Sequence, residues 1–290
     1  MNEIYVLSAF DIRLEKISEY MQYRFVRNAL VISVLIALCA ALLGVVLVLR
    51  RFSMIGDGLS HVAFGAAAVA ATVGSLDMSL TLPVTILAAI LILKGGSEKK
   101  IMGDATIAML SAGALAVGYV ILEVGGGAAN LGGDVCTALF GSSAILAIDT
   151  AELVFTVLLT ATLIALIVVF YHKIFIVTFD ERFARATGMK TERYNLAIAV
   201  VTAVVIVVGM KLAGALLMSA LIVFPAMSAM RVCKSFKMTI VVAALVAVIC
   251  AIIGVLLSIL LDTPVGATVA AADILCYGIF SLIGGENKSN

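Results

Sequence analysis

From Ala29 to Leu49 the chain runs for 21 residues without a charged side chain. A helix of that length is about 32 Å long, enough to cross the roughly 30 Å hydrocarbon core of a bilayer. Similar apolar runs recur along the sequence, and we expect eight or nine spanning helices, most simply nine. Their approximate bounds are 29–49, 55–74, 78–93, 105–122, 153–171, 194–210, 212–230, 238–261 and 265–283. The sequence therefore predicts an all-α, polytopic integral membrane protein.

The composition leaves no room for a soluble domain. Of the 290 residues 63% are hydrophobic and 13% are charged, whereas about 25% are charged in a soluble domain. We expect an N-terminal interfacial segment over residues 1–27, because its apolar side chains alternate with charges as in a helix lying flat on a membrane. A transmembrane domain over 28–284 and a short tail over 285–290 complete the chain. The net charge of +1 gives no reason to expect nucleic acid as a partner.

The basic residues predict how the chain is oriented. Fourteen of the nineteen Lys and Arg residues fall in the links after the first, third, fifth, seventh and ninth runs. Lys and Arg gather on the cytoplasmic side of membrane proteins, so these links are expected to face the cytoplasm. The N-terminus is then outside and the C-terminus is cytoplasmic, although four basic residues before the first run oppose this orientation weakly.

One ionisable pair interrupts the second apolar run. Asp57 and His61 stand four residues apart, so on a helix both side chains lie on one face. A helix continuous from Arg51 would carry Asp57 about 9 Å and His61 about 15 Å into the membrane, and ionisable residues at such depth usually mark an ion or substrate path. An oxygen and an imidazole nitrogen would form half of a site for a divalent cation, which a symmetric dimer would complete. The alternative is a structural pair, in which the two side chains satisfy each other or a neighbouring helix.

The segment over residues 50–61 reads Arg-Arg-Phe-Ser-Met-Ile-Gly-Asp-Gly-Leu-Ser-His. It resembles the signature segment of the permease subunits of manganese, zinc and iron ABC importers, and the resemblance extends over about 25–284. It implies a fold like that of type II importer permeases, with Asp57 and His61 lining the path and contacting the transported metal (Mn, Zn or Fe). No permanently bound cofactor is implied. The resemblance also implies a homodimer in a prokaryotic cytoplasmic (inner) membrane, two cytoplasmic ABC ATPase subunits and an extracytoplasmic metal-binding protein.

A second motif lies in the largest cytoplasmic link, over about 172–193. Asp180 can cap a short helix and Gly188 can end it, with Phe183, Ala184 and Thr187 expected on one side and the charges on the other. Taken alone, this segment is an ordinary solvated turn. The resemblance implies instead that it is the coupling helix, which docks into the ATPase subunit. The residues that carry this implication are Asp180, Arg182, Phe183, Ala184 and Gly188.

A third motif lies in the seventh run, where small residues recur and let helices approach closely. Pro225 should kink this helix. The run resembles the second signature of the family, with Gly214, Ser219 and Pro225 in matching places, and Lys211 is then expected in the short outer turn before the helix. On the residues alone, plain helix packing explains the pattern. A weaker resemblance, to a Leu-Phe-Gly motif of the family, lies at 139–142.

Several features narrow the function further. The sequence has no Gly-x-x-x-x-Gly-Lys-Ser/Thr motif and no His-Glu-x-x-His motif, so we expect no enzyme activity and a separate subunit as the energy source. A stand-alone secondary metal transporter or channel is the alternative, and a membrane hydrolase using the Asp/His pair is a more distant one. The five cysteines lack Cys-x-x-Cys spacing and read as packing residues. Asp273 departs from the family, which has small apolar residues there; it would hydrogen-bond to a Ser or Thr or carry a proton.

Overall fold

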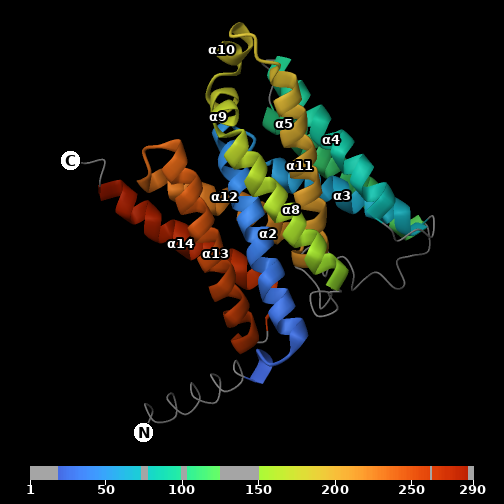
Figure 1. Ribbon diagram of the computed structural model, residues 1–290. Helices are drawn as coiled ribbons and strands as arrows, with labels where there is room; N and C mark the ends of the chain where they lie inside the picture. Colours follow the sequence, from blue (N-terminus) through green and yellow to red (C-terminus); the bar gives the residue numbers. More distant parts are fainter. Residues whose placement is uncertain (1–18, 73–77, 99–102, 125–149, 262, 287–290) are drawn as a thin grey trace.

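A computed structural model of the chain describes residues 19–72, 78–98, 103–124, 150–261 and 263–286, and every regular element within these ranges is an α-helix (Figure 1). The helices are α2 (Arg24–Leu49), α3 (Ile55–Thr72), α4 (Met78–Glu98), α5 (Gly103–Val124), α8 (Thr150–Val169), α9 (Tyr171–Phe179), α10 (Glu181–Ala186), α11 (Thr191–Ala213), α12 (Ala215–Val232), α13 (Phe236–Leu261) and α14 (Val265–Glu286).

Five of these helices, α2, α8, α11, α13 and α14, contain stretches long and apolar enough to cross a membrane. Shorter apolar stretches lie in α3, α4, α5 and α12. The prediction of an all-α chain with several membrane-spanning helices is therefore confirmed. The first 18 residues of the predicted interfacial segment and the motif at 139–142 lie outside the described residues.

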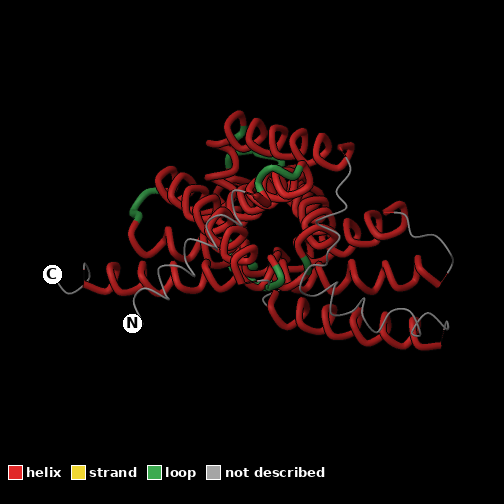
Figure 2. Tube along the Cα trace, turned by 90° about the horizontal axis from the view of Figure 1, so that it is seen from below, coloured by secondary structure: helices red, strands yellow, loops and turns green. Residues whose placement is uncertain are grey.

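The centre of the bundle is α2. Its buried residues include Ile32, Ile36, Leu43 and Leu47, and small buried residues fill the faces between them. A helix that is apolar all round can be packed on every side, and α2 contacts α8, α11, α12 and α13. In Figure 1, α12–α14 lie on one side of α2 and α3–α5 on the other, and Figure 2 shows these two groups spreading from helices seen nearly end-on.

Between α2 and α3 the chain makes a sharp turn that the sequence pattern did not predict. The Phe52 N–H donates to the Leu47 carbonyl at 2.9 Å and the Arg51 N–H donates to the Val48 carbonyl at 3.0 Å, which together form a Schellman motif. Arg51 occupies the left-handed position of this motif, with φ 63°. The helix is therefore not continuous from Arg51 to His61, and the depths expected for a continuous helix do not apply.

The charged link expected after the fifth run contains two helices, α9 and α10, at the top of Figure 1. Tyr171, Phe175 and Phe179 are spaced four apart along α9, so they share one face. All three rings contact the ring of Phe236 at the start of α13, with centroids 5.4 to 5.9 Å apart. This aromatic cluster holds α9 against the end of α13 and so positions α10 beyond it.

The break between α11 and α12 also differs from the expectation. Lys211 lies inside α11 rather than in a turn, and the chain turns at Gly214, whose φ of 90° is available mainly to glycine. Gly214 therefore caps the two helices and is not part of the predicted pathway helix. Ser219 and Pro225 lie within α12 as expected.

Candidate functional site

Asp57 and His61 lie on the first two turns of α3. The distance between His61 Nε2 and Asp57 Oδ1 is 3.5 Å, which is ion-pair range but longer than a usual hydrogen bond. The side chains are 35% exposed for Asp57 and 18% for His61, so both are reachable without being fully solvated. His61 Nδ1 is buried and has no hydrogen-bond partner among the described residues. The two side chains are thus close enough to contact the same bound ion, and the contact between them is too long to satisfy their hydrogen-bonding groups fully.

Two glycines set the surroundings of Asp57. A Cβ atom on Gly56 would lie 2.9 Å from Ile222 Cδ1 and 3.4 Å from Ser219 Cα, both on α12. A Cβ atom on Gly58 would collide with the Ile107 side chain of α5. The Gly-Asp-Gly sequence therefore lets α12 and α5 approach the start of α3 from two directions, which leaves Asp57 between them. This explains the glycines of the segment by packing rather than by turn formation.

Cavities lie on both sides of Asp57. One of about 510 Å³ is lined by Asp57, Ser219 of α12 and Ile274 of α14. Another of about 310 Å³ is lined by Asp57, His61 and Ser111 of α5. Asp57 lines both, whereas His61 lines only the second. A cation in either cavity would meet the Asp57 carboxylate, and in the smaller one it would also meet an imidazole and a hydroxyl.

No group of three or more His, Cys, Asp or Glu side chains that could hold a metal occurs within the part of the chain that the structure describes. Asp57 and His61 are the two side chains of these types that line the cavities, and their role as metal ligands stays a prediction. Of the predicted pathway residues, Ser219 lines the larger cavity, whereas Pro225 is absent from the described lining of both.

The second predicted site is α10, whose local chemistry agrees with the sequence. The Phe183 N–H donates to Asp180 Oδ1 at 2.9 Å, so Asp180 caps the helix. Beyond its end Gly188 has φ 82°, the left-handed conformation that closes a helix. The expectation that Phe183 and Ala184 share one side is wrong: Ala184 is fully buried, whereas Phe183 is 57% exposed. Adjacent residues point about 100° apart on a helix, so one packs inward while the other is presented outward.

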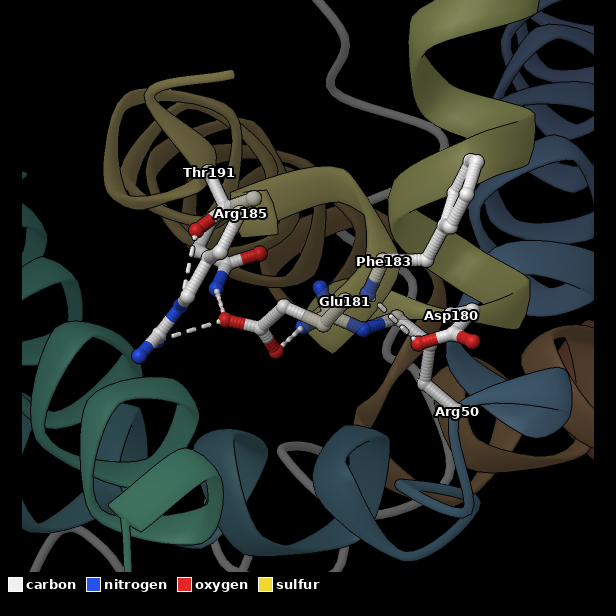
Figure 3. Close-up of polar contacts among 7 residues, drawn as sticks. Arg50, Asp180, Glu181, Phe183, Arg185 and Thr191 are labelled. Atoms are coloured by element: carbon white, nitrogen blue, oxygen red, sulfur yellow. Dashed lines mark hydrogen bonds and ion pairs between the residues drawn. The ribbon is translucent and has the colours of Figure 1, made fainter. Parts of the chain in front are cut away.

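Arg182 and Thr187 of this segment are also exposed. Together with Phe183 they form an outward surface of mixed character at the tip of the molecule. Figure 3 shows the Phe183 ring turned away from the polar contacts that lie beneath α10.

Those polar contacts centre on Glu181, a residue to which the sequence pattern assigned no role. Glu181 Oε2 lies 3.4 Å from Arg50 Nη2, and Glu181 Oε1 accepts hydrogen bonds from Arg185 at 2.8 Å and Asn195 at 3.0 Å (Figure 3). Arg185 also donates to the Thr191 hydroxyl at 3.1 Å. One carboxylate thereby ties α10 to the end of α2 and to the start of α11.

Arg50 is the buried member of this network. Its side chain is 6% exposed, and its guanidinium carbon lies 5.9 Å from the centroid of the Phe52 ring. Burial lowers the pKa of the Arg50 guanidinium, and the charge of Glu181 opposes that shift. Because Arg50 directly precedes the turn into α3, this ion pair connects the segment of Asp57 to α10.

Asp273 lies on α14. Its side chain is fully buried, and neither carboxylate oxygen has a hydrogen-bond partner among the described residues. The expected hydrogen bond to a Ser or Thr is therefore not found there. Its neighbours include the thiols of Cys250 on α13 and Cys276 one turn further along α14.

Comparison with known proteins gives a consistent result. The model of the ABC 3 transport family matches residues 22–284. The chain is 30% identical over 225 residues to a probable metal transport system membrane protein of Treponema pallidum, covering 78% of this chain and 82% of that one. It is 25% identical over 267 residues to the manganese import system permease protein ScaB of Streptococcus gordonii, covering 90% and 93%. Among solved structures, PsaBC from Streptococcus pneumoniae in complex with Fab matches with a TM-score of 0.79 and 25% identity, over 92% of this chain and 94% of that chain.

Proposed function

The chain belongs to the ABC 3 transport family and is a multi-pass membrane permease, and from this premise we propose that it carries a divalent metal ion, manganese first, past Asp57 and His61. The observation that carries the proposal is the position of this pair, side by side and partly exposed, with Asp57 lining both cavities and His61 lining the smaller one. Zinc and iron are the other cargoes to test. The relatives named for manganese favour manganese over both.

The ligand chemistry is consistent with such a cargo. Manganese accepts carboxylate oxygen and imidazole nitrogen and completes its shell with water, whereas zinc prefers four closely held ligands. Two ligands from one chain hold a metal weakly, which suits a passing ion. We propose that a second copy of the chain brings its own pair, so that the path runs between the two protomers.

The driving force is proposed to come from a separate ABC ATPase subunit that docks on α10. The exposed Phe183 would be its anchor, while the buried Ala184 and the Asp180 cap keep the helix in place beneath it. Glu181 and Arg50 would pass the movement of α10 to the start of α3. An extracytoplasmic metal-binding protein would deliver the ion on the other face of the inner membrane, with the N-terminus outside and the C-terminus in the cytoplasm.

The test is uptake of radioactive manganese into vesicles that contain the permease and its ATPase. Asp57→Asn and His61→Gln should each lower uptake about tenfold or more, because the first removes the carboxylate charge and the second removes the imidazole nitrogen while side-chain size is nearly kept. The matched control is His172→Gln, which changes the other histidine of the chain, an exposed residue on α9.

Competition with zinc and iron in the same vesicles would identify the preferred cargo. Normal uptake by both site variants would reduce Asp57 and His61 to a structural pair. Uptake that is unchanged when the ATPase is left out would instead favour a transporter that works alone.

A further inference from the structure

A basic cavity of about 500 Å³ lies between α8, α9 and α11, and its lining includes none of the residues that line the cavities at Asp57. Three of its lining residues are cationic, two are aromatic and one is a leucine of α8: Lys173, Lys190, Arg193, Phe170, Tyr194 and Leu166. No acidic residue is among the described lining residues. The charged side chains that line this cavity are therefore all positive.

The three cations are not neutralised by neighbours. None of Lys173, Lys190 and Arg193 forms an ion pair within the described part of the chain, and all three are exposed. Glu192 lies on the same turn as Arg193 but does not line the cavity. An anion entering the cavity would thus meet positive charge without a competing carboxylate in the lining.

Aromatic rings hold one of these cations in place. Lys173 Nζ lies 5.6 Å from the centroid of the Phe170 ring and 5.9 Å from that of Tyr194, and the two ring centroids are 6.2 Å apart. Both distances are within the range of a cation–π interaction. These contacts restrict the Lys173 side chain before a ligand arrives, so less side-chain entropy is lost when the ammonium group binds an anion in the cavity.

The cavity sits where membrane helices end. The apolar helix α8 ends at Val169, just before Phe170, and the apolar stretch of α11 begins at Thr191. Aromatic and basic residues at such ends mark the level of the lipid headgroups. Leu166, one turn inside α8, gives the cavity an apolar side toward the hydrocarbon.

We propose that this cavity binds an anionic phospholipid, with its phosphate held by Lys173, Lys190 and Arg193 and an acyl chain lying along Leu166 and α8. Basic pockets between membrane helices on the cytoplasmic side bind such headgroups. The lipid would bridge the end of α8 to the start of α11, next to the network that holds α10. This inference does not depend on which ion the permease carries.

The chain has no tryptophan, which offers a clean reporter. Phe170→Trp places one tryptophan in the cavity of the full-length protein, reconstituted in phosphatidylcholine vesicles. Brominated phosphatidylglycerol should quench its fluorescence at a lower mole fraction than brominated phosphatidylcholine. A second reporter, Phe155→Trp, lies on an exposed part of α8 near its opposite end and should be quenched equally by the two lipids.

Charge removal in the Phe170→Trp background tests the recognition. Lys173→Gln and Arg193→Gln should each weaken the preference for phosphatidylglycerol about fivefold, the effect of one basic residue near a charged membrane. The control pair Lys234→Gln with Lys237→Gln removes two charges at the start of α13, one just before the helix and one in its first turn; neither lysine lines the cavity, so the preference should be unchanged. Equal quenching by both lipids, or equal loss in the control pair, would overturn the proposal. Loss of the preference when millimolar inorganic phosphate is added would assign the site to a free anion and overturn the lipid assignment.

Discussion

At the scale of single residues, the ion pair between Arg50 and Glu181 is expected to matter most for the stability of the permease. Removing one partner of a buried ion pair leaves an uncompensated charge, whereas losing an exposed charge costs little. Arg50 is nearly inaccessible and its neighbour Arg51 is exposed, so two adjacent arginines have opposite energetic roles. The carboxylate of Glu181 is the only acidic partner of Arg50 in the described part of the chain.

We therefore expect Glu181→Gln to destabilise the permease by up to about 3 kcal/mol, because Arg50 keeps its charge in a buried site. Arg51→Gln, the matched loss of an exposed charge, should stay within about 0.5 kcal/mol. Thermal unfolding in detergent measures both. The double variant Arg50→Met with Glu181→Gln should recover part of the loss; a double variant worse than the sum of the singles would contradict a specific pairing.

At the scale of the element, α10 is a short helix with one buried side and one presented side. The Asp180 cap and the closing Gly188 stabilise both ends of this helix within the chain. The exposed Phe183 ring therefore contributes little to the fold of the permease itself. The same separation holds for the start of α3, where Gly56 and Gly58 serve packing and the Asp57 side chain stays partly exposed beside two cavities.

Phe183→Ala should then weaken association with the ATPase about thirtyfold while leaving the unfolding temperature unchanged, since a desolvated aromatic anchor is worth about 2 kcal/mol. Gly188→Val should weaken it too, because a β-branched residue is strained at φ 82°. Co-purification of the ATPase with each variant is the measurement. Phe155→Ala, which removes an exposed ring from α8, is the control. Full co-purification with both α10 variants would remove this helix from the docking surface.

At the scale of the whole molecule, the two groups of helices around α2 meet at the segment that contains Asp57. The α3–α5 contact is close: a Cβ atom on Gly65 would lie 2.7 Å from the Ala114 carbonyl oxygen. On the other side, Gly56 faces α12. A change in the angle between these two groups of helices would therefore change the shape of the two cavities beside Asp57.

Orientation is tested at this scale as well. In a cysteine-free background, Thr187→Cys beyond α10 should react with an impermeant thiol reagent only from the cytoplasm. Thr263→Cys, between α13 and α14, should react only from outside. Both positions are exposed, so access depends on the side of the membrane. The opposite pattern would reverse the topology and separate α10 from any cytoplasmic ATPase.

The parts of this architecture that depend on local signals were predictable from the sequence. The apolar runs predicted the helices, and the cap and glycine around α10 follow from neighbouring residues. The family inferred from residues 50–61 is confirmed by the match over 22–284. The turn after α2 was missed because an arginine, not a glycine, takes its left-handed position. The role of Glu181 was missed because its partner Arg50 lies 131 residues away, beyond any local pattern.

That separation has a consequence for how the protein is made. At synthesis rates of about 5 to 20 residues per second, Arg50 is made roughly 7 to 26 seconds before Glu181. During that interval the Arg50 guanidinium lacks the carboxylate with which it pairs in the folded protein. The contact between Arg50 and Glu181 thus forms only after the chain has been made as far as α10. Translation products that stop before Glu181 would expose an unmatched cation, a feature by which cellular quality control could distinguish them from the finished permease.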